Sequence, residues 1–227
     1  MKRFVPNLIT LGNLLCGLIA TVCAAWGQVE AAAVFIGLGI FLDFFDGLAA
    51  RLLKVSSELG KQLDSMADLV TSGVAPGLLL GVITENAIAG LLLPLFAAYR
   101  LAKFNIDTRQ THSFLGLPTP ANAIFWAALG AYPLCKYAIV PLPIMDLHGP
   151  VLKWVCFAVS LLLNIAMVSE IPMLSLKFKQ FTWKELRPKV IFLSGCLLLI
   201  VLFGLPGLSL SILFYILYSL LLVRKHD

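Results

Sequence analysis

The chain has 227 residues, of which 60% are hydrophobic and only 13% charged, and its mean hydropathy is +0.95. Soluble domains carry roughly a quarter charged residues, so this composition excludes an ordinary water-soluble protein and predicts one membrane domain. The net charge of +5 would also suit nucleic acid, but contact with anionic lipid headgroups explains it, and we expect no nucleic-acid partner.

Eight apolar segments are long enough, or nearly long enough, to cross a bilayer as helices of about 20 residues. They predict an all-α, polytopic transmembrane helix bundle with spans at 8–26, 30–53, 62–83, 86–106, 119–139, 149–169, 189–203 and 206–223. The last two are short and share a Gly-Leu-Pro-Gly turn, so a re-entrant hairpin on a six-helix core is the alternative. We therefore divide the chain into a membrane domain at 1–188 and a C-terminal hairpin with its tail at 189–227.

Basic residues gather on one side of this predicted topology. All 17 Lys and Arg residues except Lys136 and Lys153 fall in the termini and in alternate loops. The positive-inside rule places those parts, and hence both termini, in the cytoplasm of an integral protein of the cell (inner) membrane, if the source is bacterial. The basic stretch 170–189 is expected to be a loop lying against the bilayer. The first span has no signal-peptide cleavage site, and we expect it to be retained.

Four acidic residues, the four aspartates, crowd the ends of the second and third predicted spans: Asp43, Asp46, Asp64 and Asp68. Spacings of three and four residues put each pair on one helix face, and an antiparallel hairpin brings the pairs together. Carboxylates near hydrocarbon must be neutralised. Arg51 and Lys61 could pair with one or two of them. The hard oxygen ligands suit Mg²⁺ or Mn²⁺, and two ions are typical of phosphoryl transfer. A solvated acidic loop or an ion-translocation path is the alternative.

The residues around the aspartates carry a specific pattern, D-x-x-D-G-x-x-A-R-x8-G-x3-D-x3-D, between positions 43 and 68. Every fixed position is present, so the chain resembles the CDP-alcohol phosphotransferases. That resemblance implies a membrane enzyme in which Asp43, Asp46 and Asp64 bind metal. It also implies that Asp68 binds a second metal ion and accepts the proton of the nucleophile.

The same resemblance implies a binding site for a CDP-lipid. Gly47 would let the nucleotide approach closely because it has no side chain, and Arg51 would contact the diphosphate. Helix capping is an equally good explanation for the two polar residues of the N-terminal Pro-Asn-x-x-Thr element. The full set of residues expected to bind CDP-diacylglycerol is Asn7, Thr10, Gly47, Ala50, Arg51, Ser57 and Gly60.

Two later stretches, 99–105 and 114–120, resemble the phosphatidylserine synthase branch of that family. This implies L-serine as the acceptor, with its carboxylate bound by Arg100 or Lys103 and with hydrogen bonds from Asn105. Lys103 replaces a more usual arginine and loses the planar fork of that side chain. Both basic residues are explained equally well by topology alone.

The reaction implied is transfer of the phosphatidyl group from CDP-diacylglycerol to L-serine, giving phosphatidylserine and CMP. The alternatives are the same chemistry with glycerol 3-phosphate or an inositol acceptor and, in another class, a cation transporter.

A strip of small residues, Gly73, Gly77 and Gly81, follows the aspartates along the third span. Such strips allow close helix packing in membranes, either between subunits or within one. The family resemblance implies a homodimer, and on that ground we assign the strip to a dimer interface. Packing within one subunit is the alternative.

Overall fold

A computed structural model describes residues 4–55, 57–106, 114–134, 150–174 and 183–223. The predicted all-α bundle is confirmed in this part of the chain. Because α3, the π-helical turn η1 and α4 form one continuous rod, the described helices make eight rods, as predicted. The helices are α1 (Phe4–Ala25), α2 (Val29–Leu52), α3 (Glu58–Leu69), η1 (Val70–Val74), α4 (Ala75–Thr84), α5 (Ala87–Ile106), α6 (Thr119–Gly130), α7 (Pro150–Val168), α8 (Trp183–Phe203) and α9 (Pro206–Val223).

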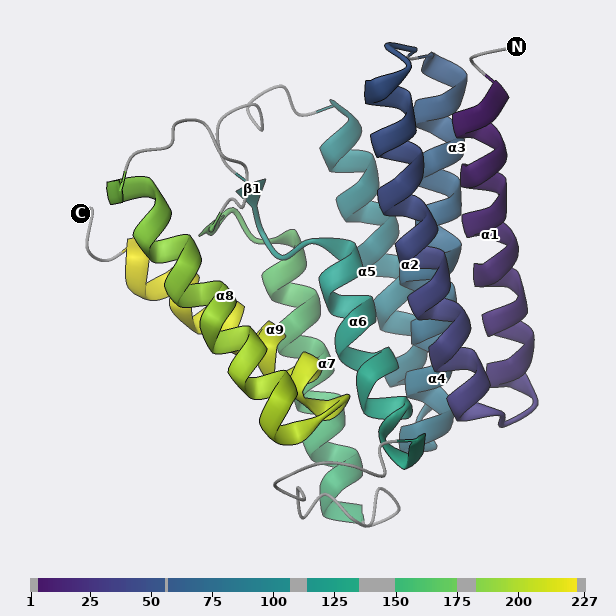
Figure 1. Cartoon of the computed structure of the whole chain (residues 1–227). Coiled ribbons are helices and arrows are strands. Elements are labelled where there is room, and N and C mark those ends of the chain that lie inside the picture. Colours follow the sequence, from purple (N-terminus) through teal and green to yellow (C-terminus); the bar gives the residue numbers. More distant parts are fainter. Residues whose placement is uncertain (1–3, 56, 107–113, 135–149, 175–182, 224–227) are drawn as a thin grey trace.

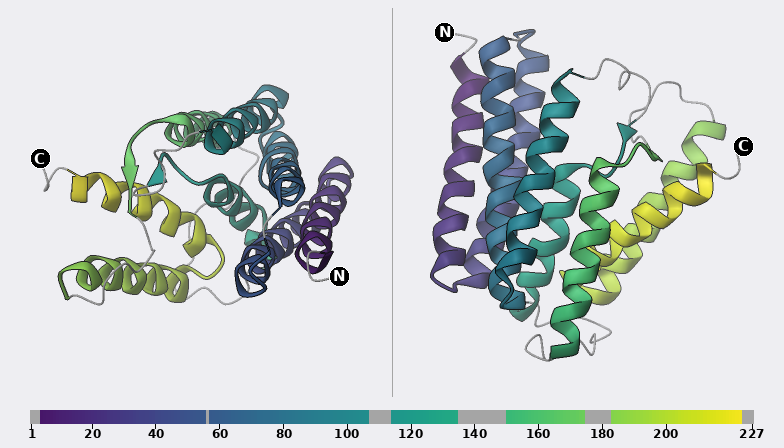
Figure 2. Two further views of the ribbon diagram at one scale, coloured as in Figure 1. Left: turned by 90° about the horizontal axis from the view of Figure 1, so that it is seen from above. Right: turned by 180° about the vertical axis from the view of Figure 1, so that it is seen from behind.

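The rods form a bundle with an inclined pair beside it. Helices α1 to α5 run side by side, while α8 and α9 form a hairpin that leans away from them (Figures 1 and 2). Most side chains of α6 are buried, and one hydrophobic core joins α5, α6, α7, α8 and α9 through Trp126, Phe192 and Tyr215. The boundary predicted at 188/189 falls inside α8, which packs into that core.

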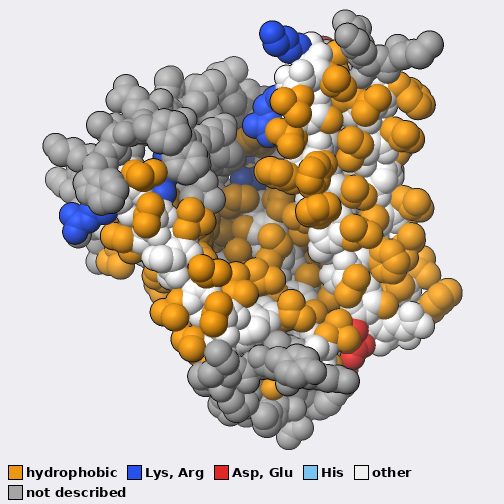
Figure 3. Space-filling model, viewed as in Figure 1, with side chains coloured by type: hydrophobic (Ala, Val, Ile, Leu, Met, Phe, Trp, Pro, Cys, Tyr) orange, Lys and Arg blue, Asp and Glu red, His pale blue; other side chains and the backbone are white. Residues whose placement is uncertain are grey.

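The outer surface fits a membrane environment. Among the described residues, five helices are long and apolar enough to cross a bilayer, and α7 and α9 contain shorter apolar helices. Apolar side chains are spread over the described part of the face in Figure 3. The N-terminal end of α1, the turn between α2 and α3 and the end of α5 lie at one end of the bundle (Figure 1), as the alternating topology predicts. Parts of the predicted topology, including Lys136 and both extreme termini, lie outside the described residues.

Two predicted boundaries are wrong. The span expected at 119–139 is helical only to Gly130 and continues as a 3₁₀ turn, Tyr132–Leu134, because Pro133 has no N–H to extend the α-helix. The loop expected at 170–189 is partly helix, since α8 begins at Trp183. Lys189 is buried in that helix, and residues 175–182 lie outside the described part.

The glycine strip packs within one subunit, so its assignment to a dimer interface is wrong. A Cβ atom on Gly77 would lie 2.6 Å from the carbonyl oxygen of Gly90 and 2.8 Å from Cδ of Pro94. Gly73 faces Ala97 in the same way. The strip therefore serves the close approach of α4 and α5.

A two-stranded antiparallel sheet joins the connections that flank α6 and α7. Strand β1 (Phe114–Leu115) pairs with β2 (Pro172–Met173). Gly116, which follows β1, has a φ of +73°. It lies so close to the end of α7 that a Cβ atom would be 2.7 Å from the carbonyl oxygens of Met167 and Ser169. Only glycine fits there, which gives the Phe-x-Gly-Leu-Pro stretch a structural role.

Candidate active site

The acidic centre lies where α2 and α3 meet. Carboxylate oxygens of Asp43, Asp64 and Asp68 all fall within 4.8 Å of one another. Asp46 is outside this closest group, but it is buried, its Oδ2 has no hydrogen-bond partner among the described residues, and its charge repels those of Asp43 and Asp64. The hairpin thus brings all four aspartates into one neighbourhood, as the spacing predicts, with three of them in ligand geometry.

The basic residues expected to neutralise this centre bind elsewhere. Arg51 donates from Nε to its own helix, at the carbonyl of Gly47 (2.9 Å). The ammonium of Lys61 donates to the carbonyl of Asn105 (3.0 Å). Within the described ranges no Lys or Arg forms an ion pair with the aspartates. Acceptor-only oxygens held together without an ion-paired Lys or Arg fit a hard divalent metal ion.

One residue of the centre, Asn13 of α1, is absent from the sequence-based predictions. Its side-chain nitrogen donates to Asp68 Oδ1 (3.4 Å), and its backbone carbonyl accepts from the Thr71 hydroxyl (3.1 Å). Asn13 is fully buried, and its Oδ1 has no partner in the described chain. The available signal was an amide in the middle of an apolar span, where polar side chains are costly and commonly functional.

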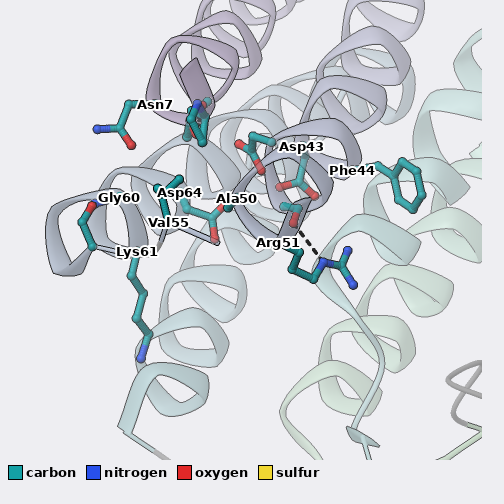
Figure 4. A pocket seen from close by; sticks show the side chains of 14 residues that line it. Asn7, Asp43, Phe44, Ala50, Arg51, Val55, Gly60, Lys61 and Asp64 are labelled. Carbon is teal, nitrogen blue, oxygen red and sulfur yellow. Dashed lines mark hydrogen bonds between the residues drawn. The ribbon is translucent and has the colours of Figure 1, made fainter. Parts of the chain in front are cut away.

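A cavity of about 470 Å³ opens beside the aspartates between α1, α2 and α3. Figure 4 shows Asp43 from α2 and Asp64 from α3 pointing into it. Lys61 and Val55 also line it, whereas Asp68 does not. Every residue predicted to bind the CDP-lipid lies on its wall: Asn7, Thr10, Gly47, Ala50, Arg51, Ser57 and Gly60.

The turn before α3 is shaped so that a ligand in the cavity can approach its backbone closely. Ser57 caps α3, because its hydroxyl accepts a hydrogen bond from the Gly60 N–H (3.0 Å). A Cβ atom on Gly60 would lie 3.0 Å from that hydroxyl and 3.1 Å from Asn7 Oδ1. Thr10 donates to the carbonyl of Pro6 within its own helix. This end of the cavity is therefore backbone-rich and polar, as a nucleotide site requires.

The three predicted acceptor residues do not converge. Lys103 forms an ion pair with Glu170 (2.9 Å) at an exposed position, and Asn105 donates to the hydroxyl of Ser65 (2.8 Å). Arg100 instead points into the protein, where it is only 8% exposed. It donates from Nη1 to Thr119 Oγ1 (3.1 Å), while its Nε has no partner in the described part.

Arg100 belongs to the same charged neighbourhood as the acidic centre. Its guanidinium is attracted by the carboxylate of Asp68 and lies 6.0 Å from the centre of the Phe104 ring. An unpaired N–H on a buried guanidinium is costly unless a ligand accepts from it. Arg100 is therefore the acceptor-side candidate that the geometry favours.

The sequence model of the CDP-alcohol phosphatidyltransferase family matches residues 3–166. The chain belongs to this family. Among its relatives, a CDP-diacylglycerol–serine O-phosphatidyltransferase of Bacillus subtilis is 41% identical over 124 residues, which cover 52% of this chain and 70% of the relative. A Helicobacter pylori protein of the same name is 35% identical over 52% of this chain and 54% of the relative. A protein of the same name from Mycobacterium leprae is 33% identical over 54% of this chain and 45% of the relative. The match thus spans about half the length of the last two relatives.

Proposed function

We propose that this member of the CDP-alcohol phosphatidyltransferase family transfers the phosphatidyl group of CDP-diacylglycerol to L-serine. The products are phosphatidylserine, which stays in the bilayer, and CMP. The observation that carries the proposal is the acidic centre beside a cavity with several polar residues on its wall, at the end of a membrane bundle. The names of the relatives from three genera support serine as the acceptor.

A divalent cofactor, Mg²⁺ or Mn²⁺, is part of the proposal. Asp43, Asp64 and Asp68 would hold it, and with Asp46 there are enough carboxylates for two ions. Bound ions would supply charge stabilisation for the diphosphate and for the departing CMP.

The cavity residues would bind and orient the donor. Gly47 and Ala50 leave room on the face of α2, and Gly60, which has no side chain, does the same at the start of α3. The guanidinium of Arg51 is exposed at the edge of the cavity, so it can turn from its own helix towards the diphosphate. Held in this way, the lipid phosphorus would face the acidic centre.

Asp68 would act as the general base. It lies in the acidic centre, is not on the cavity wall, and is attracted by Arg100. Asn13 fixes one carboxylate oxygen, which leaves the other to accept the proton of the serine hydroxyl. The serine oxygen then forms a bond to the lipid phosphorus, and the bond from phosphorus to CMP breaks.

Arg100 would bind the serine carboxylate through its planar fork. Lys103 and Asn105, the other predicted serine ligands, would act at the rim, since Glu170 and Ser65 already engage them. A phosphorylated acceptor such as glycerol 3-phosphate would call for more basic side chains than this one buried guanidinium.

Further parts of the proposal concern the setting of the enzyme. The basic loops favour a cytoplasmic active site with both termini on that side. A homodimer rests on the family resemblance alone, since the glycine strip is used within the subunit.

An acceptor panel tests this function. Purified protein, Mg²⁺ or Mn²⁺ and CDP-diacylglycerol would be incubated with L-serine, glycerol 3-phosphate or inositol, and CMP release measured. We expect release with serine well above the other two acceptors. Release with glycerol 3-phosphate or inositol alone would contradict the serine assignment. No CMP with any acceptor would favour a carrier, although a transport path would place its acidic residues nearer the middle of the bilayer.

A further inference from the structure

Two side chains of the C-terminal helix α9 form hydrogen bonds with the backbone of Leu174, next to strand β2. The Tyr215 hydroxyl donates to the carbonyl of Leu174 (3.0 Å), and the Leu174 N–H donates to the Ser219 hydroxyl (3.1 Å). Tyr215 and Ser219 are four residues apart, so they share one helix face, and both are buried. One residue thus has both of its backbone polar groups bound by side chains of α9, which lies beyond the segment matched by the family model. We call these two side chains the α9 clamp.

The backbone bound by the α9 clamp is connected to Arg100 through a series of contacts. Strand β2 pairs with β1, and the chain after β1 is fixed to the end of α7 by the bonds Gly116 N–H to Ile171 carbonyl (2.9 Å) and Leu117 N–H to Ala166 carbonyl (3.0 Å). Helix α6 then begins at Thr119, whose hydroxyl accepts from Arg100. The position of the guanidinium therefore depends on a chain of contacts that α9 holds at its far end.

Tyr215 and Arg100 are both buried, with side chains at most 8% exposed, and the two groups interact electrostatically. Tyr218, one residue before Ser219, is a useful contrast. It packs against Phe192 and Phe214, and its hydroxyl has no hydrogen bond within the described chain.

We propose that the α9 clamp positions Arg100 for the acceptor, so that Tyr215 and Ser219 set the affinity for the serine carboxylate. This inference rests on the proposed function. It gives the C-terminal hairpin a part in substrate selection in place of a purely structural part, and it makes Tyr215 and Ser219 positioning residues.

The test compares matched variants of the full-length protein. Tyr215→Phe and Ser219→Ala remove the clamp, while Ser219→Thr keeps a hydroxyl. Tyr218→Phe is the control for the phenol, and Ser211→Ala is the control for the serine because Ser211 donates to Gly207 of its own helix (2.7 Å). For each protein, kcat, the KM values of L-serine and CDP-diacylglycerol, and the unfolding temperature in detergent would be measured.

We expect the KM of serine to rise roughly three- to tenfold in the two clamp variants, as for the loss of one hydrogen bond. The KM of CDP-diacylglycerol and the kcat should stay within about twofold of wild type, since the donor cavity is untouched. The inhibition constant of L-alanine, which keeps the carboxylate but has no hydroxyl, should rise in parallel. That of ethanolamine, which has no carboxylate, should not change. Ser219→Thr and both controls should resemble wild type.

The outcomes separate this inference from the proposed function. Wild-type protein that does not use serine overturns the proposed function and the clamp with it. Wild-type protein that uses serine, with a Tyr215→Phe variant kinetically equal to Tyr218→Phe, overturns the clamp alone. Parallel losses in kcat, both KM values and the unfolding temperature also overturn it, because they indicate a structural role only.

Discussion

The two sides of the site are built in opposite ways. The donor side is an open cavity formed by three helices that follow one another in the chain, with an acidic centre to which no described Lys or Arg forms an ion pair. The acceptor side is one buried guanidinium, Arg100, held by α6 and backed by α9. Donor binding therefore depends on the grouped aspartate carboxylates and on the room in the cavity. Acceptor binding depends instead on the placement of a single cation. Variants on the two sides should fail in different kinetic parameters.

The largest effect is expected on the donor side. Replacing Asp64 by Asn keeps the size of the side chain but removes one negative charge from the acidic centre. We expect kcat to fall by at least about a hundredfold, because charge stabilisation by a bound metal is worth several kcal/mol. CMP release at saturating serine and metal measures it. Glu58→Gln, an exposed acid at the start of the same helix, is the control. An Asp64→Asn variant as active as Glu58→Gln would remove the donor side from the account.

A smaller and more selective effect is expected on the acceptor side. Arg100→Lys keeps the charge but loses the planar fork that holds a carboxylate. The KM of serine should rise by about tenfold or more, with the KM of CDP-diacylglycerol nearly unchanged.

Lys103→Gln is the companion variant for Arg100→Lys. It removes an exposed ion pair with Glu170 and should change the KM of serine much less, since such pairs contribute little. A larger effect for Lys103→Gln than for Arg100→Lys would reverse the assignment.

The smallest catalytic effect is expected at the seam between the two sides, where α4 meets α5. Gly77→Ala adds a methyl group against Gly90 and Pro94 and should lower the free energy of unfolding by about 1–3 kcal/mol. Kinetic selectivity should be kept. Gly37→Ala, where an added Cβ meets open space, is the control. Unfolding in detergent measures both. Equal stability of the two variants would show that the seam is not tightly packed.

The donor side could be predicted because its information is local. The four aspartates lie in one helical hairpin, so spacing alone brings them together, and the family resemblance marks the cavity residues of the same hairpin. Asn13 was missed because it reaches Asp68 from another helix. An amide in an apolar span marks Asn13 as unusual, but the sequence of α1 does not show which residue it contacts.

The acceptor side and the use of the glycine strip could not be predicted in the same way. Arg100, Thr119 and Tyr215 come from three different helices, the last of them far along the chain, and only their packing shows which basic residue points inward. The spacing of Gly73, Gly77 and Gly81 indicates close helix packing but not the partner, which is α5 of the same subunit. Six of the eight predicted spans differ only slightly from the observed helices. The span at 119–139 and the start of α8 were wrong because apolar composition does not record a helix end at Gly130 or a helix start among basic residues.

The most direct test of the central claim is metal removal and return. Purified protein with CDP-diacylglycerol and L-serine would be treated with a chelator, and CMP and phosphatidylserine measured before and after Mg²⁺ or Mn²⁺ is restored. We predict that both products stop together and return together in the wild-type protein. Formation of both products at an unchanged rate in the metal-free protein would contradict a catalytic role for the acidic centre as a metal site.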